Sequence, residues 1–461
     1  MNSAAESALL KFHEENPLFD KEMILLEKNE NSGLARKVMP CNREFFEKLF
    51  NSVFWKAYNE FGLASMPFDS RYLAFIADEM FFCRNTEERF LRRIGPEKAF
   101  SYSNEGISER VPLNIANIAF IAAQPFELAR NAARVSVAAL KINGELGSFG
   151  EHYNRSFSFW KENSAAEDPL TVVQPAMEGA LASMRYSLIS SLAMSLKIRL
   201  KASFAAGQNL MKEIIESARN GRREGLLENF GFFSFAPYDS SRPFLWEDPA
   251  MIELLAGIPV PIEPHYVWRE NAKLCCAMHL SVLRKAFIET GRQSGIGNEI
   301  FYLKPSELSL ALSDKNIAKG ICLKRKAEFK ENQAFLLPAR IALKGGKAFF
   351  EKEHSEKGIF GFSVGSKSQA EGRLVFVEST ADRLKVSEGD IIFSKSFSPE
   401  LVIFYGKCLA VVSETGGMLA HSAIVAREMG LPCVVQVKGA GCLKEGVKVK
   451  VDGSTGKITL V

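Results

Sequence analysis

The sequence has 461 residues, of which 47% are hydrophobic and 24% are charged, and this is the composition of a folded globular protein. These values exclude a disordered chain, a collagen-like repeat and a coiled-coil rod, and the length indicates roughly two or three domains. Basic residues exceed acidic ones only slightly, 58 against 54, for a formal net charge of +4. Because nucleic acid is bound by a clustered basic face, we predict no nucleic-acid partner.

The eight cysteines form no Cys-x-x-Cys pair, so the sequence predicts neither a zinc site nor a disulfide framework. The first residues lack the basic stretch and apolar run of a secretory signal. No run of about 18 uncharged apolar residues is present either, which is the length that a transmembrane helix needs. We therefore expect a cytoplasmic protein that holds no metal and does not contact a membrane.

Helical periodicity dominates the first two thirds of the chain. Between Gln174 and Gly207, apolar residues recur at helical spacing, which predicts one helix that ends at the glycine. Similar patterns predict further helices in the segments 43–61, 69–92, 112–141, 209–229 and 266–292. Because few stretches alternate as strands do, we predict a large, mainly α-helical domain over residues 1–315.

Phenylalanine is unusually frequent, with 36 Phe against 9 Tyr and 4 Trp. It gathers in clusters at 81–82, 157–160 and 232–235. One interpretation is an aromatic-rich helical core, and the other is an apolar pocket for a hydrophobic small molecule.

The C-terminal part of the sequence has a different character. Residues 316–358 are expected to form a linker with short strands, and in 359–461 short β-type runs alternate with glycine turns. One helix, from His421 to Met429, interrupts these runs and is ended by Gly430. The sequence thus predicts a multidomain α and α/β protein, with a compact α/β domain at 359–461.

The most informative residues lie where a strand, a Gly-Gly turn and a helix follow one another. Gly416 and Gly417 allow close backbone approach, and the turn leads to His421 at the start of the helix. A helix N-terminus offers unpaired N–H groups and a partial positive charge, which suit a phosphate. A neutral imidazole is a nucleophile near pH 7, so His421 is a candidate carrier of a phosphoryl group. The alternative is a buried, hydrogen-bonded histidine beside a turn.

Residues 359–461 resemble the mobile phosphohistidine domain of the PEP-utilising enzymes, a group that includes pyruvate phosphate dikinase, PEP synthase and rifampicin phosphotransferase. The residues that match the family pattern around the histidine are Gly416, Gly417, Ala420, His421, Ala423, Ile424, Val425, Ala426, Arg427, Glu428, Gly430 and Pro432. Ser413 stands where the family usually has Thr and keeps the hydroxyl. The resemblance implies a small, swivelling β/β/α domain in which His421 is phosphorylated and in which Ser413, Gly416 and Gly417 bind phosphate.

The helical part resembles, over roughly 220–310, the substrate-binding domain of rifampicin phosphotransferase. Three stretches carry this resemblance, at 227–249, 269–273 and 299–308. It implies that Arg269 and Lys273 lie beside the phosphohistidine in the acceptor site.

Some residues around this implied acceptor site support the expectation, and others speak against it. Arg269 and Lys273 are four residues apart on one helix, where like charges repel unless an anion lies between them. The alternative is a solvated face with Glu270 nearby. Asp239 and Glu247 are candidate bases for the proton of an acceptor hydroxyl. The family's Gly-His-Arg-Gly is replaced by a run of phenylalanines after Gly231, so either the acceptor chemistry differs or the acceptor site is degenerate.

The source of the phosphoryl group is expected on another protein. The sequence contains no Gly-x-x-x-x-Gly-Lys-(Ser/Thr) motif, and no segment resembles an ATP-grasp domain or a PEP-binding barrel. The layout resembles the split phenylphosphate synthases. We therefore expect a separate ATP-grasp subunit that binds ATP and Mg²⁺, and no cofactor bound by this chain alone.

Taken together, the sequence predicts a phosphotransferase component. Phospho-His421 would pass its group from the ATP-grasp subunit to a hydroxyl of a small apolar or aromatic acceptor. One alternative is a non-catalytic, ligand-binding or regulatory relative that keeps the fold. Another is a carrier that takes its phosphoryl group from PEP.

Overall fold

The computed structural model describes most of the chain. The described residues are 8–9, 12, 24–28, 37–63, 72–83, 99–103, 106–110, 124–163, 168–195, 209–221, 223–234, 237–248, 251–256, 264–333, 337, 340–344, 347–350, 359–378, 382, 384–395, 399–414, 421–438 and 443–461. They divide into two units. The helical unit spans Met1–Lys28, Lys37–Met211 and Pro261–Lys352, and the barrel unit spans Asn29–Arg36, Lys212–Val260 and Glu353–Val461.

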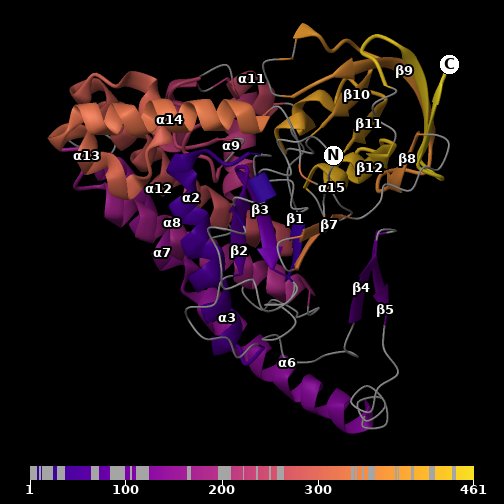
Figure 1. The fold of residues 1–461 in the computed structure, drawn as a ribbon, viewed down its shortest axis with the longest axis horizontal. Helices are drawn as coiled ribbons and strands as arrows, with labels where there is room; N and C mark the ends of the chain where they lie inside the picture. Colours follow the sequence, from indigo (N-terminus) through magenta and orange to yellow (C-terminus); the bar gives the residue numbers. More distant parts are fainter. Residues whose placement is uncertain are drawn as a thin grey trace. The chain divides into compact units, whose positions relative to one another are not determined.

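A long central helix, α12 (Pro264–Ser294), organises the helical unit (Figure 1). Between Asn271 and Arg284 every side chain is buried except Lys273, which is half-buried. A helix that is surrounded on all sides shows no single apolar stripe, because every face of it packs against another element. The other helices of the described chain before the barrel are α2 (Pro40–Lys48), η2 (Leu49–Val53), α3 (Phe54–Glu60), α6 (Gln124–Gly147), α7 (Phe149–Asn163), α8 (Val173–Ser195), α9 (Leu210–Arg219), α10 (Arg223–Phe230), α11 (Met251–Ala256), η3 (Gly297–Tyr302), η4 (Pro305–Glu307), α13 (Leu308–Ser313) and α14 (Lys315–Gln333).

Most of the predicted helices are confirmed. The segment 43–61 is helical throughout, although η2 in its middle is a π-helical turn. The helix predicted from Gln174 is α8, and the stretch 196–208 beyond it lies outside the described residues. The remaining predicted segments, 112–141, 209–229 and 266–292, overlap α6, α9 with α10, and α12, and the residues 112–123 lie outside the described residues.

The helix predicted over 69–92 is wrong. Its described residues form the hairpin of β2 (Leu73–Ile76) and β3 (Glu79–Cys83). The two turn residues, Ala77 and Asp78, have φ of 48° and 64°, as the common two-residue hairpin turn requires. Asp78 is one of the residues that favour such a turn, but Ala77 is not, so the local signal in the sequence was weak.

The clusters of phenylalanine fit the first of their two interpretations. Phe81 in β3 is fully buried in the core beneath the hairpin. Trp160, Phe232 and Phe233 are also buried, whereas Phe235 lies outside the described residues. These aromatic side chains contribute to cores within their units.

The hairpin belongs to a five-stranded antiparallel sheet of order β2-β3-β1-β6-β7. Its remaining strands are β1 (Ile24–Lys28), β6 (Arg340–Lys344) and β7 (Lys347–Phe350). The pairing of β1 with β6 joins the beginning of the chain to the stretch predicted as a linker, which also contains most of α14. A separate hairpin is formed by β4 (Ala99–Ser103) and β5 (Gly106–Arg110).

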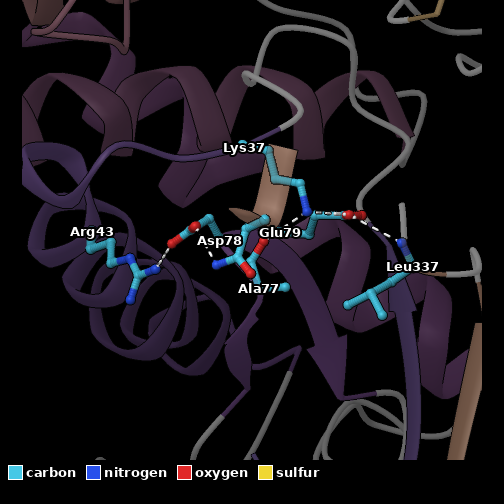
Figure 2. A network of polar contacts seen from close by, with 7 residues as sticks. Lys37, Arg43, Ala77, Asp78, Glu79 and Leu337 are labelled. Carbon is cyan, nitrogen blue, oxygen red and sulfur yellow. Dashed lines mark hydrogen bonds and ion pairs between the residues drawn. The ribbon is translucent and has the colours of Figure 1, made fainter. Parts of the chain in front are cut away.

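A buried polar network fixes the turn between β2 and β3 (Figure 2). Lys37 Nζ donates to the Glu79 carboxylate at 2.7 Å and to the Ala77 carbonyl at 2.8 Å. The same Glu79 oxygen accepts the backbone N–H of Leu337 at 3.1 Å. Asp78 is paired with Arg43 on α2. Since the Lys37 and Glu79 side chains are only 7% and 3% exposed, water screens the attraction between them little.

The barrel unit contains a closed seven-stranded barrel of order β10-β11-β12-β8-β14-β13-β9. The strands β9, β10, β11 and β12 run parallel, and the other neighbours run antiparallel. Their bounds, with those of the two helical segments of the unit's C-terminal part, are β8 (Ile359–Ser363), β9 (Gln369–Phe376), β10 (Ile391–Ser394), η6 (Pro399–Phe404), β11 (Ala410–Ser413), α15 (His421–Glu428), β12 (Cys433–Lys438), β13 (Lys448–Asp452) and β14 (Lys457–Leu460).

Two cores explain the continuous apolar runs of the parallel strands. Ala410 and Val412 of β11 belong to one core and Val411 between them to the other, which also includes Ala423 and Val425 of α15. Strands buried on both faces need apolar residues at every position, and β10 and β11 are buried throughout. The predicted strands, closing hairpin and single helix are confirmed, and so is the fold class, a large helical region followed by a small domain of strands with one helix.

Among the described residues no helix combines the length and the apolar composition that a bilayer crossing requires. Seven cysteines lie in the described part of the chain, all of them buried and none of them in a disulfide.

Candidate functional site

His421 is the first residue of α15. The helix follows β11, and Gly416 and Gly417, which lie between them, are outside the described residues. β11 runs parallel to both of its neighbours, so α15 begins beyond the carboxyl end of the parallel part of the barrel. Ligands of parallel sheets bind at this end, and a helix N-terminus there favours an anion.

Small residues allow α15 to pack closely on the barrel. Ala423 and Ala426 are fully buried, and Val425 is 4% exposed in the same core. The guanidinium of Arg427 donates to the carbonyl of Val364 at 2.9 Å, which ties the end of α15 to the chain after β8. The residues that follow His421 in the sequence therefore fix the direction of the helix that begins with it.

The end of α15 has the two hydrogen bonds of a Schellman motif. The backbone N–H of Gly430 donates to Arg427 at 3.1 Å, and that of Leu431 donates to Ala426 at 2.8 Å. Gly430 has a φ of 70°, a conformation that glycine adopts without strain. The predicted helix stop at this glycine is confirmed.

Ser413 is the last residue of β11, and it is fully buried. It lies opposite Ser394 of β10, which is 3% exposed. The next residue, Glu414, donates its backbone N–H to Ser394 at 3.1 Å. The role of Ser413 in binding phosphate stays a prediction, as do those of Gly416 and Gly417.

Arg269 and Lys273 are neighbours on α12 with Glu270 between them. Lys273 Nζ lies 2.8 Å and Arg269 Nε 3.6 Å from the same oxygen, Oε1 of Glu270. All three side chains are only 15% or 16% exposed. Burial lowers the pKa of Lys273, and Arg269 lowers it further, against the opposing effect of Glu270. The spacing of the two cations predicted an anion between them, and the Glu270 carboxylate of this chain lies there.

Asp239 and Glu247 both bind backbone in the turns that follow α10. Asp239 Oδ1 accepts the N–H of Ser241 at 2.9 Å, and Glu247 Oε2 accepts the N–H of Phe244 at 3.2 Å. These bonds give each carboxylate a local role in shaping the turn. Both residues and His421 belong to the barrel unit, whereas Arg269 and Lys273 belong to the helical unit.

His279 on α12 is part of a buried cluster with His152 of α7. His279 Nε2 lies 3.1 Å from Ser156 Oγ, and His152 Nε2 lies 2.9 Å from Ser183 Oγ. Burial lowers the pKa of His279 to about 3, and that of His152 to about 4. Both imidazoles are therefore neutral at pH 7, and His279 belongs to the core of the helical unit.

No group of three or more His, Cys, Asp or Glu side chains with the arrangement of a metal site occurs in the described ranges. Sequence reasoning named Glu270 only as a neighbour of Lys273 and did not see it as the anion between the two cations. Its spacing of three residues from Lys273 was the available signal. The role of Arg427 was visible only as a match to the family pattern.

The fold and the site agree with a known family. The sequence model of the family described as "PEP-utilising enzyme, mobile domain" matches residues 386–456, which include β10 to β13 and α15. The C-terminal barrel is therefore a mobile domain of the PEP-utilising type.

Parts of the chain are similar to several known proteins, two of which are named as phosphotransferases. The chain is 29% identical over 175 residues to the uncharacterized phosphotransferase YvkC of Bacillus subtilis, with 35% of this chain and 21% of the relative covered. It is 41% identical over 88 residues to phosphoenolpyruvate synthase of Pyrococcus furiosus, with 19% and 11% covered. It is 28% identical over 204 residues to rifampicin phosphotransferase of Bacillus subtilis, with 42% and 23% covered. The chain thus spans less than a quarter of the length of these relatives.

Proposed function

We propose that this chain is a phosphotransferase component that carries a phosphoryl group on His421. The observation that supports this most strongly is the start of α15 at His421, beyond the carboxyl end of β11, within the segment that matches the mobile-domain family. A phosphoryl group on the first residue of a helix is next to unpaired backbone N–H groups, which stabilise its negative charge.

The first transfer takes a phosphoryl group from ATP on a separate ATP-grasp subunit, where Mg²⁺ would also be bound. A ring nitrogen of neutral His421 attacks the β-phosphorus, the bond to the bridging oxygen of the α-phosphate breaks, and AMP leaves. Hydrolysis then releases the terminal phosphate as inorganic phosphate, and one phosphoryl group remains on the histidine. Such reactions depend mainly on positioning and on compensation of charge.

The second transfer delivers the group to a hydroxyl of a small acceptor. The hydroxyl oxygen attacks phosphorus, the N–P bond to His421 breaks, and the hydroxyl proton passes to a carboxylate. We assign that base to Asp239 or Glu247, and the compensation of phosphoryl charge to Arg269 and Lys273. The partly buried setting of these two cations supports this assignment, because charges act more strongly where water is scarce. The similarity to a rifampicin phosphotransferase supports an apolar or aromatic acceptor.

The test combines the chain with a candidate ATP-grasp protein encoded beside it and with ATP labelled at the β- or γ-phosphorus. We expect acid-labile label from β-labelled ATP, since phosphohistidine hydrolyses in acid, and none that persists from γ-labelled ATP. The variant His421→Ala should remain unlabelled, whereas the control His13→Ala should be labelled as the natural chain is. Equal labelling of His421→Ala would contradict the proposal. Replacing ATP by PEP in the same assay identifies a PEP-driven carrier.

A second function is favoured by one observation. Phe232 and Phe233, which follow Gly231 where the family has its polar motif, are buried in the core and present no polar group to an acceptor. The loss of the polar motif supports a non-catalytic relative that keeps the fold and binds a ligand through other residues. In that case the natural chain would stay unlabelled, and the His421→Ala variant would bind the ligand as tightly as the natural chain does.

A further inference from the structure

Two serines interrupt the apolar pattern of the parallel strands in the barrel. β10 and β11 are buried at all four positions and apolar at the first three, but each strand ends in a serine, Ser394 and Ser413. The two serines lie opposite each other in the pairing of these strands, and they are 3% and 0% exposed. Strands that are buried on both faces are normally apolar throughout, so these two hydroxyl groups require an explanation.

The alternation of side chains along β10 and β11 shows which face the serines occupy. Ile391 and Phe393 belong to the core that all seven strands share, whereas Ile392 belongs to the core that includes residues of α15. Successive side chains of a strand point to opposite faces, so Ser394 shares the face of Ile392. The same alternation on β11 places Ser413 on this face, which is the one on which α15 packs.

The serines form the polar centre of a row that crosses the four parallel strands. On one side, Val377 donates its backbone N–H to Phe393 at 2.8 Å, so it lies beside Ser394. On the other side, the residue of β12 next to Ser413 is Val435, one position beyond the last pair of β11 and β12. Both valines are fully buried in the core that includes α15. The two flanking positions of the row are therefore apolar, and the two central ones carry hydroxyl groups.

This row lies at the end of the strands where α15 begins. The helix connects β11 to β12, and because these strands run parallel, it has to run back along them from their carboxyl ends. His421 is its first residue. The hydroxyl pair thus lies at the same end of the sheet, and on the same face, as the start of the helix that begins with His421.

The backbone of the two serines already takes part in the sheet. Glu414, which follows Ser413, donates its backbone N–H to the carbonyl of Ser394 at 3.1 Å. The hydroxyl groups are not part of this ladder. A buried hydroxyl stabilises a fold when it is hydrogen-bonded and destabilises it when it is not. Two hydroxyl groups at the carboxyl ends of β10 and β11 are therefore suited to hold the chain that leads from β11 to α15.

We propose that Ser394 and Ser413 form a hydroxyl pair that positions the start of α15, and with it His421. The consequence for phosphoryl transfer rests on the proposed function. A nucleophile that is held in one orientation reacts faster than one that has to be ordered during the reaction. Ser394 thereby adds a positioning residue on β10 to a site whose sequence motif lies on β11 and α15. Such a role does not require either hydroxyl to touch the phosphoryl group.

The experiment compares variants that remove a hydroxyl group with one that removes only packing. Ser394→Ala and Ser413→Ala each remove one hydroxyl group, and Ser394→Thr keeps it. The matched control Val377→Ala trims an apolar side chain of the same row. Urea unfolding of the full chain measures the stability of each variant, so that a loss of folding is recognised as such.

The first measurement needs no phosphoryl donor. The six histidines are labelled with ¹³C at Cε1, and the NMR signal of His421 is the one that is lost in His421→Ala. We expect this signal to move in Ser394→Ala and in Ser413→Ala, because the imidazole is then held differently. It should stay close to its natural position in Ser394→Thr and in Val377→Ala.

The second measurement is the rate at which His421 is labelled from β-labelled ATP, at increasing concentrations of the ATP-grasp protein. We expect Ser394→Ala to lower the maximal rate about tenfold and to leave the half-saturating concentration almost unchanged, since orientation and not binding is affected. Ser394→Thr should restore most of the rate, and Val377→Ala should be labelled as the natural chain is.

A natural NMR signal and a natural rate of labelling in both alanine variants would overturn the positioning role. Equal losses in Ser394→Ala and Val377→Ala, or no recovery in Ser394→Thr, would overturn it as well, because packing would then be the cause. If the natural chain is not labelled but the His421 signal moves in the alanine variants alone, the pair positions His421 and only the proposed function fails. If the natural chain is labelled and the alanine variants match it in both measurements, the proposed function stands and only this inference is wrong.

Discussion

The helical unit and the barrel unit specify their folds in different ways. In the helical unit, Lys37, Glu79 and Leu337 come from three distant parts of the chain and meet in one buried network. In the barrel unit, most residues that shape α15 lie within ten positions of His421, from Ala423 to Leu431, and the bond of Arg427 to Val364 reaches further. A short motif therefore specifies the candidate site in the barrel, whereas the helical unit depends on contacts between segments that no local pattern connects.

The largest effect is expected from breaking the long-range network. Glu79→Gln removes the carboxylate charge 2.7 Å from the buried ammonium of Lys37, which costs about 3–5 kcal/mol of stability. Hydrogen exchange of β1, β3 and β6 should accelerate by the corresponding factor. The control Glu299→Gln removes the partner of an exposed lysine and should change exchange little. Equal effects of the two variants would show that the helical unit does not depend on this network.

A comparable local test exists in the barrel. Gly456 has a φ of 71°, and a side chain there would overlap the carbonyl oxygen of Gly361. Gly456→Ala should destabilise the barrel by about 2–4 kcal/mol, because both the backbone conformation and the contact become unfavourable. Gly430→Ala has a similar φ and open space around it, so its cost should be only about 1 kcal/mol. Urea unfolding compares the two variants, and equal costs would show that the close contact adds nothing.

The response to acid should distinguish the two units further. His152 and His279 have pKa values of about 4 and about 3 in the folded chain, below the ordinary value of 6.5, because they are buried. Below pH 6.5 the unfolded chain takes up protons that the folded chain does not, so stability falls as the pH falls toward 4. The slope is at most about 1.4 kcal/mol per pH unit for each histidine. Hydrogen exchange of α7, α8 and α12 should accelerate on acidification, and His279→Asn should reduce the slope. An unchanged slope in that variant would contradict the assignment.

The smallest effect is a gain in stability. Gln436 lies in the irregular part of β12, where the pairing with β8 shifts, and has a φ of 54°. Gln436→Gly relieves this backbone conformation and should stabilise the barrel by about 0.5–1 kcal/mol, measured as a higher urea midpoint. A lower midpoint would mean that contacts of the glutamine side chain outweigh the strain.

The features that could be predicted from the sequence are those that neighbouring residues in the chain determine. The helix from His421, its end at Gly430 and the apolar strands around it followed from residues that are close together in the chain. The hairpin at β2 and β3 was missed because Asp78 alone is a weak turn signal beside Ala77, and their conformation is also held by Lys37 and Arg43 from elsewhere. The pairing of β1 with β6 joins strands about three hundred residues apart, which no periodicity reveals.

The candidate site shows the same limit. His421 could be identified because its motif is contiguous. Arg269 and Lys273 were recognised as a charged pair. The role of Glu270 as the anion between them depends on the rotamers that place its carboxylate against Lys273. The local bonds of Asp239 and Glu247 to their own turns likewise became visible only in the folded chain.

The most direct measurement is a map of the phosphorylated residue. The chain is incubated with ATP and the ATP-grasp protein, digested at neutral pH and analysed by mass spectrometry. The account predicts one phosphoryl group on the peptide that contains His421, and none on peptides with the other five histidines. A phosphoryl group on another residue, or transfer to an acceptor without any on His421, would contradict it.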